Sequence, residues 1–201
     1  MSKGGKTRRR IVAEAARLFN RRGFDGGSMA DLMGATGLEK GGIYRHFSTK
    51  EELAAEAFDY AWQAATDVNM QDLDSIPNSV DKLKRFMLNF IEGRRSVPGG
   101  CPLLNTAIDA DDGNPVLRKR ARKALHQWQD LLSEIVTAGI KRKEIRNGVN
   151  PKKLVRLIVG SLEGALMIRQ LERDREALLE TQSHLENYLD SEVRLSAREK
   201  N

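Results

Sequence analysis

The sequence predicts an all-α protein, and three observations support this. The 201 residues are rich in Leu, Ala, Glu, Lys and Arg and contain only five prolines, a composition typical of helical globular proteins. Apolar residues recur at helical spacing along most of the chain. Ser28, Asn114 and Asn150 stand where such stretches begin, as helix-capping residues do.

The first expected helix covers residues 6–22. Ile11, Ala15, Leu18 and Phe19 recur at the spacing of one helix face. Gly23 follows as the expected C-cap. Residues 1–5 are expected to fray.

The next segment predicts a helix-turn-helix. Ser28 precedes Asp31 by three residues, which approximates a capping box for a short helix over 29–36. Gly37 permits the left-handed backbone of a sharp turn. A third helix is expected over 39–47, with Ile43 and Phe47 on one face. Ser48 or Thr49 then caps a fourth helix that runs toward residue 70.

The rest of the chain predicts further helices separated by clear breaks. A loop is expected over 71–78, a helix over 79–94, a break at 97–102 and a short helix over 103–110. Asn114-Pro115 and Asn150-Pro151 each begin a helix with a cap followed by proline. The stretch 154–168 is apolar on nearly all sides, which predicts a buried helix. A last amphipathic helix carries its apolar positions at Leu178, Leu185, Tyr188, Leu189 and Val193.

The positive charge is confined to the N-terminal quarter. Residues 1–50 contain eleven Lys and Arg against four Asp and Glu, whereas the remainder contains twenty-three against twenty-four. Such a local positive field favours a polyanion, either nucleic acid or an anionic membrane surface. A solvated basic tail without a partner is the alternative.

A helix-turn-helix within this positive field predicts docking on duplex DNA, with the second helix in the major groove. Side chains of that helix are expected to meet guanine acceptors or phosphates, and Lys50 to neutralise a phosphate. The two glycines of the helix would let DNA approach the bare backbone; alternatively they merely weaken a helix held by packing. Arg8, Arg9 and Arg10 would follow the DNA backbone or enter an adjacent minor groove, as basic arms do; the alternative is a disordered, solvated tail. The expected DNA-contacting set is Arg8, Ser28, Lys40, Gly41, Gly42, Tyr44, Arg45, His46 and Lys50.

The segment GLEKGGIYRHFSTKEEL resembles the DNA-binding signature of the tetracycline-repressor (TetR) family of bacterial regulators. The resemblance extends from about residue 7 to residue 53 and includes ARLFNRRGFDGGSMADL and the turn at Thr36, Gly37 and Leu38. Glu39 stands where a Ser or Thr cap is common in the family, and Gly42 replaces a small Thr, Ser or Ala. The resemblance implies a DNA-binding domain over 1–53. It also implies a helical regulatory domain over 54–201 that binds a small effector and dimerises through its last two helices.

A candidate effector pocket combines aromatic and apolar residues with a few polar groups, as ligand pockets do. The expected lining is Trp62, Phe86, Met87, Phe90, Cys101, Asn105 and Trp128. The alternative for each of these residues is an ordinary place in the core. Cys101 is either a redox sensor or a buried thiol, since it is the only cysteine and no second one can resolve an oxidised form.

The helix over 154–168 also predicts a homodimer. An all-apolar helix followed by an amphipathic one leaves surface for a partner subunit, and two-fold pairing is the commonest way to cover it. Other helices of the same chain are the alternative cover. Gly160 and Gly164 would allow a second helix to approach closely.

No feature of the sequence predicts catalysis. His46, His126 and His184 are scattered and give no metal spacing, and we expect no cofactor, nucleophile elbow or phosphate-binding glycine loop. Without a spanning run or an export leader, we expect a cytoplasmic protein.

The prediction is therefore a transcriptional regulator that represses from a palindromic operator until a small effector releases it. The alternatives are a ligand-binding or scaffolding helical protein without specific DNA readout, and a transcriptional activator.

Overall fold

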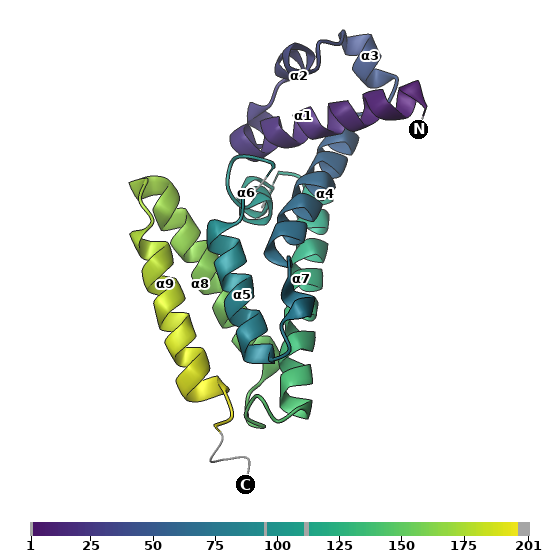
Figure 1. The fold of residues 1–201 in the computed structure, drawn as a ribbon. Coiled ribbons are helices and arrows are strands. Elements are labelled where there is room, and N and C mark those ends of the chain that lie inside the picture. The colour runs from purple at the N-terminus through teal and green to yellow at the C-terminus, as the bar shows by residue number, and fades with distance from the viewer. Residues whose placement is uncertain (1, 95, 111–112, 197–201) are drawn as a thin grey trace. The chain divides into compact units, whose positions relative to one another are not determined.

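The computed structural model describes residues 2–94, 96–110 and 113–196, which fold almost entirely into helices (Figure 1). Within these residues, β structure is limited to one isolated antiparallel bridge between Ile145 and Arg194. The all-α prediction is therefore confirmed. Contacts between Cα atoms divide the chain into two units, which contain the described parts of 1–66 with 95–125, and of 67–94 with 126–201.

The first unit contains the N-terminal helices and one later helix. Its elements are α1 (Lys3–Gly26), α2 (Met29–Thr36), α3 (Lys40–Tyr44), α6 (Pro102–Asp109) and the first parts of α4 (Lys50–Asn69) and α7 (Pro115–Lys141). Its core is apolar and fully buried around Ile11, Leu32, Ile43 and Phe47. The shared face of Ile43 and Phe47 thus holds α3 and the residues after it against α1 and α2.

Helix α1 differs from its expected form at both ends. It begins at Lys3, because the Ser2 hydroxyl accepts a hydrogen bond from the Gly5 N–H at 3.2 Å. At Gly23 the backbone turns into the left-handed region (φ 75°) and forms a kink, after which one more helical turn runs to Gly26. Residues 3–5 are therefore helical rather than frayed, and residue 1 lies outside the described residues. The helix breaks at Gly23, where its end was expected, but another helical turn follows.

Other helices begin or end closer to the residues expected from the sequence. Helix α3 covers only Lys40–Tyr44, shorter than the expected 39–47. The predicted caps are confirmed at Asn114 and Asn150, whose Oδ1 atoms each accept a backbone N–H at 3.0 Å. At the start of α4, the Thr49 hydroxyl accepts the Glu52 N–H at 3.1 Å.

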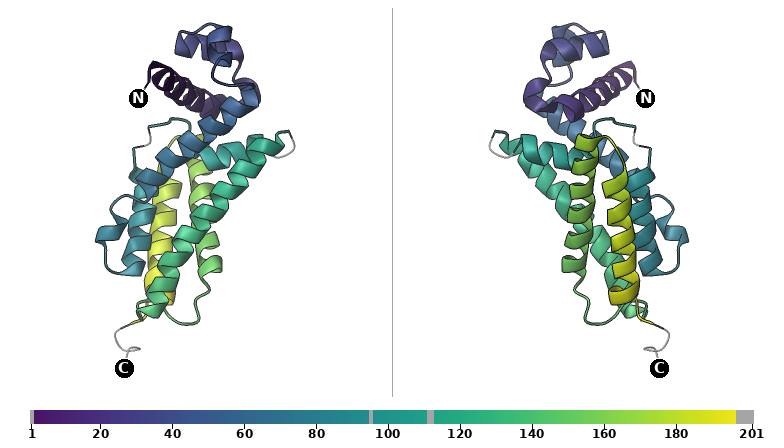
Figure 2. Two further views of the ribbon diagram at one scale, coloured as in Figure 1. Left: turned by 90° about the vertical axis from the view of Figure 1, so that its right-hand side faces the viewer. Right: turned by 90° about the vertical axis from the view of Figure 1, so that its left-hand side faces the viewer.

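The second unit consists of helices that pack around a separate core. Its elements are η1 (a 3-10 turn, Leu73–Ser75), α5 (Ser79–Glu92), α8 (Pro151–Glu172), α9 (Glu176–Tyr188), η2 (a π-helical turn, Leu189–Val193) and the last parts of α4 and α7. Helices α8 and α9 run side by side, as the right-hand view of Figure 2 shows. Ion pairs join α5 to η2 and the residue after it: Lys84 to Asp190 at 2.5 Å and Asp81 to Arg194 at 2.5 Å.

Helix α8 is buried on one face only. Leu154, Ile158 and Leu162 are at most 4% exposed, whereas Leu157 is 46% and Met167 47% exposed. The expectation of a helix buried on all sides was wrong for the single chain. Its inner face packs within the second unit, while its outer face has no cover among the described residues.

Candidate nucleic-acid interface

The α2–turn–α3 pair has the geometry of a helix-turn-helix. Ser28 and Asp31 form the predicted capping box: the Ser28 hydroxyl accepts the Asp31 N–H at 3.1 Å, and the Asp31 carboxylate accepts the Ser28 N–H at 3.0 Å. The Ser28 hydroxyl also donates to that carboxylate, which lowers the pKa of Asp31, with help from Arg22. Gly37 ends α2 in the left-handed conformation (φ 63°), so the chain can turn sharply into α3.

The outer face of α3 offers donors to solvent. Lys40, Tyr44 and Arg45 are exposed, and the Lys40 ammonium lies 5.9 Å from the centre of the Tyr44 ring. Gly41 is exposed as well, and a Cβ added there would meet no atom within 4 Å. This face can therefore approach another surface closely and donate hydrogen bonds to it. Gly42 is half-buried, and a Cβ there would touch Leu38 at 3.6 Å.

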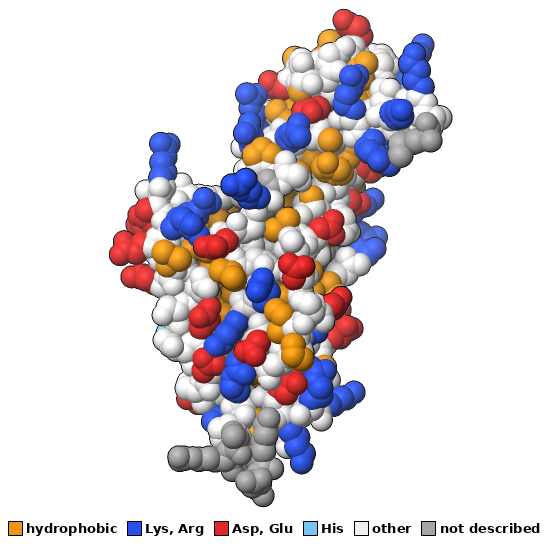
Figure 3. All heavy atoms as spheres, in the orientation of Figure 1, with side chains coloured by type: hydrophobic (Ala, Val, Ile, Leu, Met, Phe, Trp, Pro, Cys, Tyr) orange, Lys and Arg blue, Asp and Glu red, His pale blue; other side chains and the backbone are white. Residues whose placement is uncertain are grey.

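Arg8 connects α1 to the start of α4. Its guanidinium donates to both carboxylate oxygens of Glu56, at 2.6 and 2.5 Å, and lies 4.7 Å from the centre of the Phe47 ring. The hydrogen bond to Glu56 raises the pKa of Arg8. Its neighbours Arg9 and Arg10 are helical and exposed. Figure 3 shows blue Lys and Arg side chains gathered over α1–α3.

Three other residues expected to contact DNA form hydrogen bonds within the protein or are partly buried. The Ser28 hydroxyl is used in the capping box, and His46 is half-buried. The Lys50 ammonium donates to the carbonyl oxygen of Phe24 at 2.5 Å and lies 4.3 Å from the centre of the Phe24 ring. Lys50 therefore points to the end of α1 in this structure.

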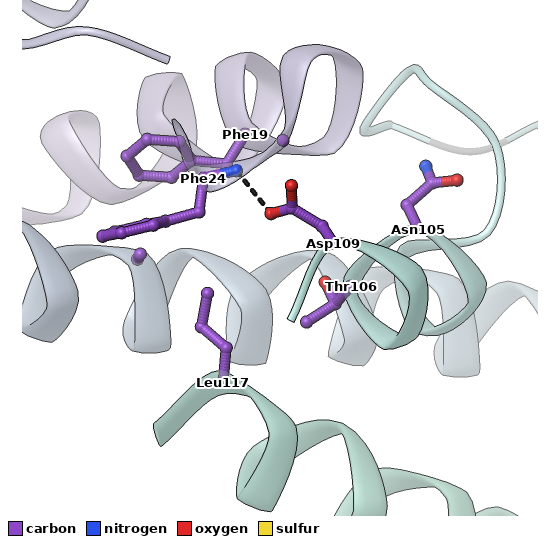
Figure 4. Close-up of a pocket in the computed structure, with 8 residues that line it drawn as sticks. Phe19, Phe24, Asn105, Thr106, Asp109 and Leu117 are labelled. Carbon is purple, nitrogen blue, oxygen red and sulfur yellow. Dashed lines mark hydrogen bonds between the residues drawn. The ribbon is translucent and has the colours of Figure 1, made fainter. Parts of the chain in front are cut away.

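A joint between α1 and α6 contains residues whose pairing nothing in the sequence indicated. The Asn105 amide donates to the Asn20 carbonyl oxygen at 3.0 Å and to the Gly99 carbonyl oxygen at 2.8 Å. One helical turn further on, the Asp109 carboxylate accepts the Phe24 N–H at 2.6 Å (Figure 4). The hollow beside them measures only about 30 Å³, room for a water molecule rather than an effector. We call this region the α1–α6 joint.

The expected effector-lining residues fall into the two units. In the second unit, Phe86 and Phe90 place their ring centres 5.7 and 6.2 Å from that of Trp128, and Met87 is fully buried. The first unit contains the other three: Trp62, Cys101 and Asn105.

The polar and thiol groups of this set are turned inward. The Asn105 amide is directed at α1. The Cys101 side chain is 2% exposed, which favours a core thiol because a reactive cysteine needs access to solvent.

Comparisons with known proteins decide the family. Residues 11–57 match the family described as "Bacterial regulatory proteins, tetR family", and residues 79–185 match "Tetracyclin repressor-like, C-terminal domain". A TetR transcriptional regulator from Chloroflexus aurantiacus J-10-FL is 43% identical with a TM-score of 0.93, and the match covers 98% of this chain and 100% of that one. The chain belongs to the TetR family. It is therefore a DNA-binding transcriptional regulator of the helix-turn-helix type.

Two further relatives support the assignment of this chain to the TetR family. A TetR-family regulator from Cytophaga hutchinsonii is 33% identical with a TM-score of 0.91 and matches over 98% of each chain. The transcriptional repressor DhaR of Mycobacterium sp. (strain GP1) is 25% identical over 175 residues, which are 85% of this chain and 86% of DhaR.

Metal-binding clusters and membrane-spanning helices are both missing from the part of the chain that the structure describes. Within those ranges, no group of three His, Cys, Asp or Glu side chains is placed to hold a metal ion. None of the described helices combines the length and the apolar character that crossing a membrane requires.

Proposed function

We propose that this TetR-family regulator is a repressor that binds a palindromic operator as a two-fold dimer and leaves it when a small effector binds. The exposed face of α3, with Lys40, Gly41, Tyr44 and Arg45, is the observation that carries the proposal. The similarity to the repressor DhaR supports repression in particular. As a repressor of bacterial genes, the protein would act in the cytoplasm and by binding rather than catalysis.

The operator test starts from DNA that the purified protein selects out of genomic fragments. The Tyr44→Ala variant is expected to bind a selected duplex at least about tenfold more weakly, because alanine supplies neither the phenolic hydrogen-bond donor nor the aromatic ring. Tyr60→Ala is the matched control, since Tyr60 on α4 is 38% exposed and Tyr44 is 39% exposed. Equal affinity of the Tyr44 variant and the wild type would contradict the assigned DNA face.

The dimer would form through the outer faces of α8 and α9. On α8, Leu157, Gly164, Ile168 and Leu171 recur at helical spacing, and the three apolar side chains are 39–77% exposed. Leu179 on α9 is 50% exposed. Gly164 offers an open backbone, because a Cβ added there meets nothing within 4 Å. A second copy of this face would bury the stripe about a two-fold axis.

Sedimentation equilibrium tests this interface. Leu157→Glu is expected to shift the protein toward monomer, because dimerisation would bury an unpaired carboxylate. Leu131→Glu on α7 serves as the control, since Leu131 is 40% exposed and Leu157 is 46% exposed. A monomeric wild type, or equal dimerisation of both variants, would refute the proposed interface.

The aromatic cluster of Phe86, Phe90 and Trp128 supports an effector site in the second unit, because ligand pockets are mostly apolar and aromatic. A compound library screened for release of the selected duplex provides the probe. Phe90→Leu is expected to weaken release, whereas Phe58→Leu on α4 is not. If compounds release the duplex equally from both variants, the effector site lies elsewhere.

The proposed domain organisation is the one expected from the sequence, with residues 1–53 binding DNA and residues 54–201 forming the regulatory domain. Contacts nevertheless group α6 with the DNA-binding helices in the first unit, where it packs against α1. Helix α6 is therefore placed to influence how α1 supports the helix-turn-helix.

A further inference from the structure

We infer that the operator half-site presents G·C base pairs to α3, and that Glu39 and Lys40 select them. Glu39 accepts a hydrogen bond from a cytosine amino group in the major groove, and Lys40 donates to a guanine of the same or a neighbouring base pair. This inference rests on the proposed DNA-binding role of α3 and names the bases that this surface takes. It depends neither on repression nor on an effector.

The first argument is the carboxylate of Glu39, which the local structure leaves unused. Glu39 is the N-cap of α3, and its main-chain carbonyl oxygen accepts the Gly42 N–H at 2.8 Å. Its side chain makes no capping hydrogen bond, in contrast to that of Ser28, which caps α2. Glu39 is also exposed. Its carboxylate oxygens are therefore available as acceptors beside the face of α3 that is proposed to enter the groove.

The second argument is the chemistry of the other side chains on this face. Lys40, Tyr44 and Arg45 are exposed and carry hydrogen-bond donors. Ile43, the one aliphatic side chain of α3, is 1% exposed and therefore turned away from a thymine methyl group. Guanine is the base whose major-groove edge carries two acceptors and no donor. A row of donors with the carboxylate of Glu39 beside it therefore matches guanine paired with cytosine.

The third argument is the lack of side-chain amides in this part of the chain. Asn and Gln are the residues that pair bidentately with adenine, and the sequence contains neither between Asn20 and Gln63. The structure describes every residue in that interval. Among side chains whose hydrogen bonds favour one base, the helix-turn-helix therefore offers those that pair with guanine or cytosine.

The charge of Glu39 also penalises the other bases. A carboxylate in the major groove is repelled by the phosphates and by the base acceptors N7, O6 and O4 unless a donor faces it. Amino groups of cytosine and adenine are the donors there, and adenine places its N7 acceptor beside its amino group. Cytosine is therefore the base that suits Glu39 best, and specificity comes from repulsion of the others as well as from the contact itself.

The test compares the selected duplex with duplexes in which each base pair of the half-site is replaced in turn. The wild type is expected to lose about tenfold in affinity on replacement of at least two G·C pairs, the effect of one lost base contact at each. Glu39→Gln is expected to lose the preference at one of these pairs and to favour adenine there, because a glutamine amide pairs with adenine N6 and N7. Glu51→Gln removes an exposed carboxylate from the first turn of α4 and is the matched control, with unchanged base preference.

Base analogues assign the Lys40 contact to an atom. Replacing the selected guanine by 7-deazaguanine removes the N7 acceptor and is expected to weaken wild-type binding about fivefold, whereas Lys40→Met should respond by less than about twofold. Hypoxanthine keeps N7 and O6 and lacks only the minor-groove amino group of guanine. A hypoxanthine·cytosine pair should therefore bind nearly as well as G·C, which separates major-groove contacts from an effect of DNA shape.

Three results would overturn the inference. They are a selected half-site made only of A·T pairs, wild-type base preference in Glu39→Gln, and a Lys40→Met variant that binds all sequences equally more weakly. The last result, with a slope of log K against log salt reduced by about 0.9, is the mark of a phosphate contact. If the wild type selects no duplex, DNA binding by α3 fails before any base is compared, so the two failures are distinguishable.

Melting temperatures guard against simple loss of folding. The Glu39 side chain makes no capping hydrogen bond and Lys40 is exposed, so Glu39→Gln and Lys40→Met are both expected to melt within about 2 °C of the wild type. A large drop in the melting temperature of Glu39→Gln, together with unchanged base preference, would assign Glu39 a structural role and refute the inference.

Discussion

The outer face of α3 and the α1–α6 joint belong to the same unit, but their polar groups differ in environment. Those of α3 are exposed to solvent, whereas those of the joint are hydrogen-bonded within the protein. On α3, Lys40, Tyr44 and Arg45 are exposed and the backbone at Gly41 is open. In the joint, Asn105 and Asp109 direct their polar atoms at α1 over distances of 2.6–3.1 Å. A surface that binds DNA must keep its donors available, whereas a joint that positions it gains by satisfying every polar group.

The largest expected effect of breaking the joint is at Gly23. Gly23→Ala places a Cβ 2.5 Å from the Asp109 carboxylate at a residue with φ of 75°. We expect a loss of about 1–3 kcal/mol in the free energy of unfolding, from the strained backbone alone, together with weaker operator binding. Denaturant unfolding measures the loss. Gly26→Ala, whose Cβ finds only ordinary contact at 3.5 Å, should cost far less.

The next largest effect on stability is expected at Asn105, whose side-chain amide lies at the other end of the α1–α6 joint. Asn105→Ala removes the donor to the carbonyl oxygen and side-chain oxygen of Asn20, a residue that is 8% exposed. Leaving a buried acceptor with fewer partners costs about 1–3 kcal/mol. Thermal unfolding should show the loss. Ile108→Ala on the same helix, at 69% exposure, should leave the melting temperature nearly unchanged.

On the outer face of α3, one substitution, Gly41→Ala, should change stability and operator binding in opposite directions. Gly41→Ala is expected to stabilise the protein by up to about 1 kcal/mol, since alanine favours helix and the added methyl group meets nothing. It should weaken operator binding, because the methyl group occupies the space that DNA approaches. Gly42→Ala, whose methyl group would face Leu38 at 3.6 Å, is the matched comparison. Improved stability with full affinity for Gly41→Ala would argue that α3 does not approach DNA at that residue.

The smallest expected effect is a pH dependence of the capping box. The hydrogen bond from Ser28 lowers the pKa of Asp31 from its ordinary value of 3.8, so its contribution to stability is present above that value. The contribution is lost as pH falls through the lower pKa of the folded state. Melting temperatures of the wild type and Ser28→Ala should converge in this acidic range. A constant difference between them would exclude the linkage.

The sequence anticipated local structure well where a few neighbouring residues decide it. The capping box at Ser28 and Asp31, the turn at Gly37 and the caps at Asn114 and Asn150 are all present. These features depend on hydrogen bonds within about one helical turn, so residue type and spacing are enough. The DNA-contacting and effector-lining sets remain predictions.

What the sequence could not supply were contacts between residues far apart in the chain. Nothing near Asp109 indicates that it binds Phe24, 85 positions earlier, and the pattern around Lys50 suggested a phosphate contact. Similarly, the apolar stretch on α8 predicted burial without saying what covers Leu157.

By itself, then, the amino-acid sequence determined the helices and their caps, because periodicity and short-range hydrogen bonding are properties of neighbouring residues. The family followed from the resemblance of the helix-turn-helix segment to a known signature. Only the tertiary structure decided which side of each helix is covered and where long side chains such as Lys50 and Arg8 find their partners. Burial and side-chain partners depend on how segments that are far apart in the chain pack together, and the spacing of residues in the sequence does not give those packing distances.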